Sequence, residues 1–173
     1  MKKALIFLLI FVPSLALLYF GLTRDPRTLP SALVHKPAPD FELARIDGGK
    51  VELRTLKGLP LVINFWSTWC SSCAVEHQLI REAVQKYASS PIRFYSVLYE
   101  DTPENAKSFI GNYGKGAPIL LDPGLRTSID YGVSGVPETF FIDRNGIVRL
   151  RYSGPLTPDI LFGEIDALLQ EGS

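Results

Sequence analysis

The two cysteines of the sequence, Cys70 and Cys73, are separated by two residues and form a C-x-x-C motif. A thiolate can attack a disulfide, and a second thiol one helical turn away can then attack the first sulfur and release the partner. The motif lies between a short apolar run and an amphipathic one, which predicts a strand-to-helix junction. Free N–H groups and the helix dipole favour a thiolate at a helix start. The motif therefore predicts thiol:disulfide exchange, with Cys70 as the exposed nucleophile and Cys73 as the shielded resolving thiol.

Three other roles of the cysteine pair stay open. A structural disulfide is common in exported proteins, although closing a two-residue loop contributes little stability. A metal site would combine the two cysteines with His77, with zinc or copper as the metal, whereas closed zinc sites normally have four ligands. A peroxidase would need a lone reactive cysteine, and the neighbouring Cys73 argues against that role.

The elements that must position the pair follow from apolar patterning. Two alternating runs around Gly48-Gly49 predict a β-hairpin over residues 41–53. The apolar run 61–65 predicts a buried strand that leads directly into the motif. After Cys73, apolar residues recur at steps of three and four and predict an amphipathic helix that ends near Pro91. Its predicted buried face consists of Val75, Leu79, Ala83, Val84 and Tyr87.

The second half of the sequence continues to alternate between strands and helices. Strands are expected at residues 92–98, 119–121, 139–143 and 147–152. Helices are expected at residues 102–113 and 125–131 and from Thr157 to near the C-terminus. Thr-Pro pairs at positions 102 and 157 supply an N-cap followed by a proline in the first turn. The alternation predicts an α/β domain whose sheet is partly parallel.

The N-terminus differs from the rest of the chain. Lys2 and Lys3 precede an apolar stretch over residues 4–22. As a helix this stretch would span roughly 28 Å, close to the bilayer's hydrocarbon core of about 30 Å. The sequence predicts an uncleaved transmembrane anchor over residues 1–22, with the remaining chain on the outer face of the cytoplasmic membrane, in the periplasm of a two-membrane cell. A cleaved signal peptide is the alternative.

The rest of the chain is expected to form a tether and one domain. Residues 23–38 contain several prolines and show little periodicity, so they predict an extended tether. Residues 39–173 are expected to form one compact domain, because a chain of 173 residues with 46% hydrophobic content can bury one core. The formal net charge is zero and no long basic run occurs, which argues against a nucleic-acid partner.

Two segments carry a resemblance to a known family. Residues 65–73, Phe-Trp-Ser-Thr-Trp-Cys-Ser-Ser-Cys, resemble the active site of thioredoxin-like proteins. Residues 131–143, Tyr-Gly-Val-Ser-Gly-Val-Pro-Glu-Thr-Phe-Phe-Ile-Asp, resemble the G-V-x-G-x-P-E-T-F-x-I-D signature of the CcmG/DsbE branch, which serves cytochrome c maturation and is related to ResA and TlpA. Ser71-Ser72 departs from the pattern, in which a proline often follows the first cysteine. The resemblance implies a thioredoxin-like fold: a central mixed sheet flanked by helices, with an added N-terminal hairpin and one transmembrane helix.

The resemblance also implies roles for residues outside the cysteine pair. Pro137 corresponds to a cis-proline that lies against the cysteines and leaves the Val136 backbone free to pair with a substrate strand. Trp69 is expected to pack beside the disulfide and to gate access to it, in preference to filling the core. Glu138 is expected to help shape the substrate groove, or simply to begin a strand.

Glu76 matches an acidic residue that this branch keeps near its active site. A carboxylate three residues after Cys73 can exchange a proton with that thiol and can raise thiol pKa values by charge repulsion. The alternative is a helix-start glutamate that only interacts with the helix dipole.

The partners implied are exported disulfide proteins, most specifically apocytochrome c, whose C-x-x-C-H motif must be reduced before haem is attached. The protein would be recharged by a membrane electron donor of the DsbD or CcdA kind, and it would need no cofactor. Two alternatives stay open: a general disulfide reductant of the cell envelope, and a copper-binding assembly module with the same fold.

Overall fold

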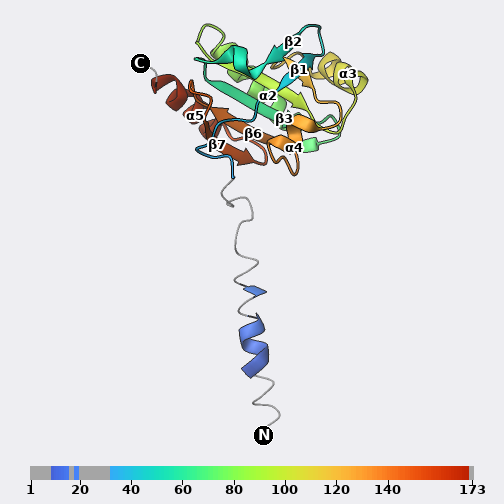
Figure 1. Ribbon diagram of the computed structural model, residues 1–173. Coiled ribbons are helices and arrows are strands. Elements are labelled where there is room, and N and C mark those ends of the chain that lie inside the picture. The colour runs from blue at the N-terminus through green and yellow to red at the C-terminus, as the bar shows by residue number, and fades with distance from the viewer. Residues whose placement is uncertain (1–8, 16–17, 20–31, 172–173) are drawn as a thin grey trace. The chain divides into compact units, whose positions relative to one another are not determined.

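The structure, a computed structural model, describes residues 9–15, 18–19 and 32–171 (Figure 1). Residues 9–15 and 18–19 are helical, and the chain from residue 32 onward folds around one sheet. None of the helices formed by these residues is both long and apolar enough to cross a membrane. Most of the anchor predicted over residues 1–22 falls outside the described residues, so it stays a prediction.

Seven strands form a single mixed sheet in the order β2-β1-β5-β4-β3-β6-β7. The central strands β3, β4 and β5 run parallel, and the outer strands join them antiparallel. This arrangement confirms the predicted mixed sheet and the N-terminal hairpin, which is formed by β1 and β2. The bounds are β1 Glu42–Arg45, β2 Lys50–Glu52, β3 Leu61–Trp66, β4 Arg93–Leu98, β5 Ile119–Leu121, β6 Glu138–Ile142 and β7 Val148–Ser153.

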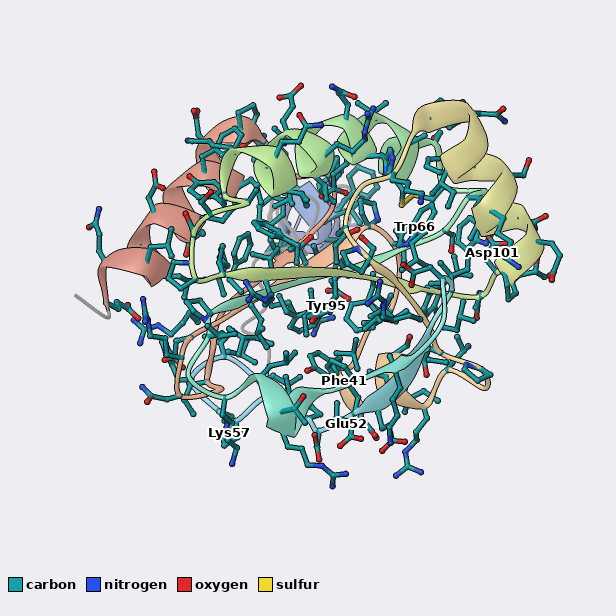
Figure 2. All side chains as sticks on the ribbon, turned by 90° about the horizontal axis from the view of Figure 1, so that it is seen from above. Phe41, Glu52, Lys57, Trp66, Tyr95 and Asp101 are labelled. Atoms are coloured by element: carbon teal, nitrogen blue, oxygen red, sulfur yellow. A yellow bond between two sulfur atoms is a disulfide. The ribbon has the colours of Figure 1, made fainter. Side chains whose placement is uncertain are left out.

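Helices α2, α3 and α4 and a short 3-10 helix, η2, connect these strands, and helix α5 follows the last strand. Thr102 and Thr157 cap α3 and α5 through their side-chain hydroxyls, as the sequence predicts. Helices α2, α3 and α5 lie along one side of the sheet (Figure 2). The hairpin and Tyr131, which follows α4, pack into the apolar cluster on the opposite face. The bounds are η2 Leu53–Leu56, α2 Ser71–Lys86, α3 Pro103–Tyr113, α4 Arg126–Asp130 and α5 Pro158–Gln170.

Strand β3 is the central element of the core. All six of its residues are buried, and they alternate between the two faces of the sheet. Parallel β4 ends beside it, because Trp66 pairs with Leu98. Antiparallel β6 begins beside it, because Phe65 pairs with Glu138. The end of β3, the end of β4 and the start of β6 therefore meet at one edge of the sheet, directly before the cysteine motif.

The buried face of α2 differs from the predicted one. Val75 is 77% exposed, whereas Cys73, Glu76, Ile80 and Ala83 are buried and follow steps of three and four. Because the buried face includes the carboxylate of Glu76, the pattern of apolar residues predicted the wrong buried face for the first turn of α2. Ala83 and Tyr87, further along, are buried as predicted.

The folded domain begins earlier than residue 39. The backbone N–H of His35 donates to Val148, and that of Ala38 donates to Gly146, at 2.8 Å each. Pro37 also forms an isolated bridge with Ile147. The last residues of the predicted tether are therefore paired with the chain around the start of β7.

We expect the Phe140→Ala substitution to lower the free energy of unfolding by about 3–5 kcal/mol. The Phe140 ring is fully buried and packs against Phe65 and Tyr131, so truncation would leave a cavity in the core. The matched control is Ile129→Ala, because Ile129 is 67% exposed and its loss should cost less than about 0.5 kcal/mol. Urea unfolding measures both. Equal losses for the two variants would contradict the assigned core.

Candidate active site

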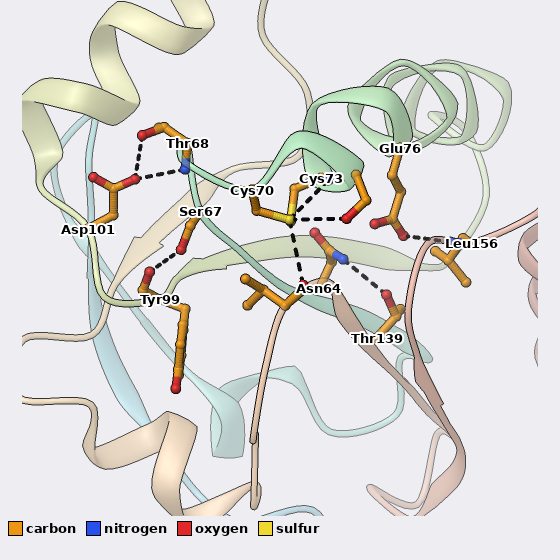
Figure 3. The surroundings of a disulfide bond; sticks show 12 residues. Asn64, Ser67, Thr68, Cys70, Cys73, Glu76, Tyr99, Asp101, Thr139 and Leu156 are labelled. Atoms are coloured by element: carbon orange, nitrogen blue, oxygen red, sulfur yellow. Dashed lines mark hydrogen bonds between the residues drawn. A yellow bond between two sulfur atoms is a disulfide. The ribbon is translucent and has the colours of Figure 1, made fainter. Parts of the chain in front are cut away.

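Cys70 and Cys73 form a disulfide at the start of helix α2, with 5.2 Å between their Cα atoms (Figure 3). Cys70 is the N-cap residue, and its Sγ accepts a hydrogen bond from the Cys73 backbone N–H at 3.1 Å. In the reduced protein this sulfur would face the free N–H groups and the positive end of the helix dipole, which both favour a thiolate. The structure thus places Cys70 where the predicted nucleophile must lie, and the division of roles between the two thiols stays a prediction.

Both cysteines are covered in the oxidised protein. Cys70 is 6% exposed and Cys73 is 3% exposed, so the large difference in exposure that the sequence predicts is absent from this disulfide form. The reason is packing: the pair belongs to an apolar cluster with Trp66, Leu98 and neighbouring side chains. A partner's disulfide can therefore reach the Cys70 sulfur only at the small part of it that the neighbouring side chains leave exposed.

Trp69 lies at the surface immediately before Cys70. Its side chain is 59% exposed, and its indole N–H donates to the Glu100 carbonyl at 3.1 Å. Trp69 thus does not fill the core, and this bond fixes its ring to the loop after β4. Packing of the ring beside the disulfide and gating of access to it both stay predictions.

The segment before β6 forms a second wall of the site. The Val136–Pro137 peptide bond is cis, as the resemblance implies. The Val136 carbonyl oxygen lies 3.6 Å from the Cys70 Sγ. Val136 is half-buried, whereas Pro137 is buried. Among the residues predicted to bind a substrate, Val136 is therefore the one whose backbone lies against the Cys70 sulfur.

The Glu138 side chain is buried and paired with other side chains of the protein. Its carboxylate is almost fully buried, pairs with Arg151 and accepts a hydrogen bond from the Ser153 hydroxyl at 2.6 Å. Arg151 in turn donates to the Gly132 carbonyl at 2.8 Å. Of the two predicted alternatives, the placement favours a carboxylate that fixes the start of β6 over one that contacts a substrate.

Glu76 is buried on the face of α2 that also carries Cys73. It is 3% exposed, and its Oε1 accepts the Leu156 backbone N–H at 3.3 Å (Figure 3). Its Oε2 has no hydrogen-bond partner within the part of the chain that the structure describes. Burial raises the pKa of Glu76 to about 7, and the bond from Leu156 only partly offsets this effect. A carboxyl group that titrates near neutral pH suits a proton carrier better than it suits a surface glutamate at a helix start.

His77 does not complete a metal site with the cysteines. Its Nε2 bonds to the Gly114 carbonyl at 2.9 Å, and its ring packs against Trp66 and Phe109. Burial lowers the pKa of His77, which favours the neutral imidazole. Across residues 9–15, 18–19 and 32–171, no three side chains of His, Cys, Asp or Glu lie together as metal ligands would. His77 instead joins α2 to the chain after α3.

Sequence reasoning missed two residues that support the site. Asp101 binds the segment before Cys70, and Arg151 binds the loop before Pro137. Each contact joins residues that lie far apart in the chain, so no local motif signals it.

Residues 34–151 match the AhpC/TSA family. The chain belongs to this family. Two relatives, both thiol:disulfide interchange proteins DsbE, come from Allochromatium vinosum and Escherichia coli, and each is 36% identical. The first alignment covers 97% of this chain and 93% of the relative, and the second covers 99% and 96%. A solved thiol:disulfide interchange protein of the thioredoxin family from Chlorobium tepidum is 27% identical, with a TM-score of 0.69 over 82% of this chain and 99% of that one.

These similarities confirm the thioredoxin-like fold and the resemblance to the DsbE branch. They also decide between the chemical roles of the cysteine pair. A disulfide at a helix start, in a chain whose relatives are thiol:disulfide interchange proteins, makes this protein a thiol:disulfide oxidoreductase.

We expect the Glu76→Gln substitution to change how stability depends on pH. The ordinary pKa of this carboxyl is 4.5 and its folded value is about 7, so the folded protein holds the proton more tightly than the unfolded chain. The resulting stabilisation is complete below pH 4.5 and is lost as pH rises through 7. The free energy of unfolding of the oxidised wild type should therefore fall by about 3 kcal/mol relative to Glu76→Gln over this range.

Urea unfolding at several pH values measures this difference. The control is Glu82→Gln, which changes an exposed glutamate on the same helix and should leave the pH dependence of the wild type intact. Parallel curves for the wild type and Glu76→Gln would show that Glu76 does not carry the raised pKa.

Proposed function

We propose that this protein reduces disulfides of exported proteins, most specifically the C-x-x-C-H motif of apocytochrome c, on the outer face of the cytoplasmic membrane. The observation that supports a reducing role for this protein is that Glu76 is buried on the same face of α2 as Cys73. A negative charge there opposes formation of a thiolate. A destabilised thiolate disfavours the reduced protein, which makes it a better electron donor.

The reaction transfers two electrons to the partner in two exchange steps. The Cys70 thiolate attacks the partner's disulfide, forming a mixed disulfide and releasing one partner thiolate. Glu76, in its charged form, accepts the proton of Cys73. The Cys73 thiolate then attacks the Cys70 sulfur, which closes the Cys70–Cys73 disulfide and releases the second partner sulfur. The partner leaves as a dithiol, and this protein leaves oxidised.

Further turnover requires an electron donor. The closed disulfide of the described structure corresponds to the spent form in this scheme. A membrane protein of the DsbD or CcdA kind would supply the next two electrons by the reverse exchange at Cys70. The relatives are named thiol:disulfide interchange protein DsbE, which supports this class of reaction. The identity of the electron donor is part of our proposal.

The proposed location rests on the first residues of the sequence. Lys2 and Lys3 precede the apolar stretch 4–22, which is long enough to span a bilayer as a helix. In this proposal residues 1–22 anchor the chain in the cytoplasmic membrane. The thioredoxin-like domain then lies in the oxidising compartment that holds exported apocytochrome c.

The decisive experiment is capture of the substrate. We expect Cys73→Ala to accumulate a mixed disulfide between Cys70 and an oxidised peptide carrying C-x-x-C-H, because the resolving thiol is missing. Non-reducing gel electrophoresis and mass spectrometry measure the adduct. Cys70→Ala is the matched control and should capture nothing.

A second peptide separates the specific substrate from a general one. The histidine of C-x-x-C-H is replaced by alanine, with the rest of the peptide unchanged. Preferential capture of the histidine peptide supports the apocytochrome assignment. Equal capture of both peptides would reduce the proposal to a general reductant of the envelope, and the absence of any adduct would overturn it.

A further inference from the structure

The chain between β3 and α2 is held by the loop that follows β4. We call residues 67–70 the junction segment and residues 99–101 the β4 loop. The first three residues of the junction segment each donate a side-chain hydrogen bond to the β4 loop. Figure 3 shows the bonds of Ser67 and Thr68. The pairs are Ser67 with the Tyr99 carbonyl, Thr68 with the Asp101 carboxylate and Trp69 with the Glu100 carbonyl. The chain directly before Cys70, the fourth residue of the segment, is therefore held in place and has little freedom to move.

Asp101 makes the most contacts in this arrangement. Its Oδ2 accepts hydrogen bonds from the Thr68 backbone N–H at 2.7 Å and from the Thr68 hydroxyl at 2.5 Å. Its Oδ1 accepts from the Thr102 backbone N–H at 2.7 Å and from the Asn105 amide at 2.8 Å. One carboxylate oxygen thus accepts hydrogen bonds from the junction segment, and the other accepts hydrogen bonds from the start of helix α3.

The Asp101 carboxylate is ionised at neutral pH. Partial burial opposes the charge, but the hydrogen bonds from Thr68, Asn105 and Thr102 outweigh burial and lower the pKa of Asp101. Hydrogen bonds to an ionised acceptor are stronger than those between neutral groups. The bonds to Thr68 are therefore among the strongest that fix the junction segment.

The backbone of the β4 loop is itself specialised. Glu100 adopts a left-handed conformation with φ of 46°, which is unfavourable for a residue with a Cβ atom. This conformation lies between the residue that binds Ser67 and the one that binds Thr68. The loop therefore keeps a strained geometry at the point where it meets the junction segment.

We propose that Asp101 is a positioning residue of thiol:disulfide exchange, which acts through Thr68 to hold Cys70 as the N-cap of helix α2. The hydrogen bonds of Asp101 go to Thr68, Thr102 and Asn105 and not to the sulfurs, so its effect passes through the backbone of the junction segment. The proposal concerns the exchange reaction itself, so it does not depend on apocytochrome c being the partner.

Positioning and plain charge predict opposite effects when Asp101 is removed. If Asp101 acts only as a nearby negative charge, its loss eases formation of the Cys70 thiolate and moves the pH profile of the reaction to lower pH. If Asp101 holds Cys70 at the helix start, its loss lets the sulfur leave the Cys73 N–H and the helix dipole. The thiolate is then less favoured, and the profile moves to higher pH.

The experiment measures how fast the reduced full chain reduces a small aromatic disulfide as a function of pH. We expect Asp101→Ala and Thr68→Val each to slow the reaction by up to about tenfold at a pH below the midpoint and to raise the midpoint of the profile by about one pH unit. Thr68→Val keeps every charge and the shape of the side chain, and it removes only the hydroxyl. It therefore tests the proposal even if Asp101→Ala folds poorly.

Two variants serve as matched controls. Thr68→Ser keeps a hydroxyl for Oδ2, and Asn105→Ala removes a bond only from Oδ1, so both should stay within about twofold of the wild-type rate. Urea unfolding of all four variants reports stability separately from the reaction. A midpoint that moves to lower pH in Asp101→Ala would overturn the proposal. So would a wild-type rate and midpoint in Thr68→Val.

Discussion

The hydrogen bond from the Cys73 backbone N–H to the Cys70 sulfur combines a structural and a chemical role. Helix N-caps are usually serine, threonine, aspartate or asparagine, whose oxygen satisfies a free N–H of the first turn. Here a cysteine sulfur occupies that position at 3.1 Å. The donors that would otherwise stabilise an oxygen are therefore directed at the atom that must become a thiolate. Because Cys70 caps helix α2, the elements that hold this residue in place serve both the fold and the reaction.

The sheet order explains how three distant segments reach this one sulfur. Strand β3 lies between parallel β4 and antiparallel β6, so the end of β4 and the start of β6 flank the end of β3. From one side the loop after β4 supplies Asp101, which binds Thr68. From the other side the chain entering β6 brings the Val136 carbonyl to 3.6 Å from the Cys70 sulfur. Helix α2 itself contributes Glu76, which is buried on the same face of the helix as Cys73. A different strand order would separate these groups even if every element were unchanged.

The parts of the site that local patterns encode could be predicted from the sequence. The hairpin, the buried strand 61–65, the capped helices and the cysteine motif all depend on neighbouring residues, and the structure confirms them. The buried face of α2 was misplaced at Val75 because Glu76, a carboxylate, occupies a core position that apolar patterning excludes. The roles of Asp101 and Arg151 could not be predicted, because their partners are set by strand pairing across the sheet. The cis state of Pro137 could be expected only from family resemblance, because most X-Pro bonds are trans.

The central claim is that the position of Cys70 at the start of helix α2 makes it the nucleophile. The most direct test is to treat the reduced full chain with a limiting amount of iodoacetamide at a series of pH values and to locate the label by mass spectrometry. The account predicts that Cys70 is labelled first and that its labelling begins at lower pH than that of Cys73, because only its sulfur faces the helix N-terminus. Labelling of Cys73 first, or of both cysteines at the same pH and rate, would contradict it.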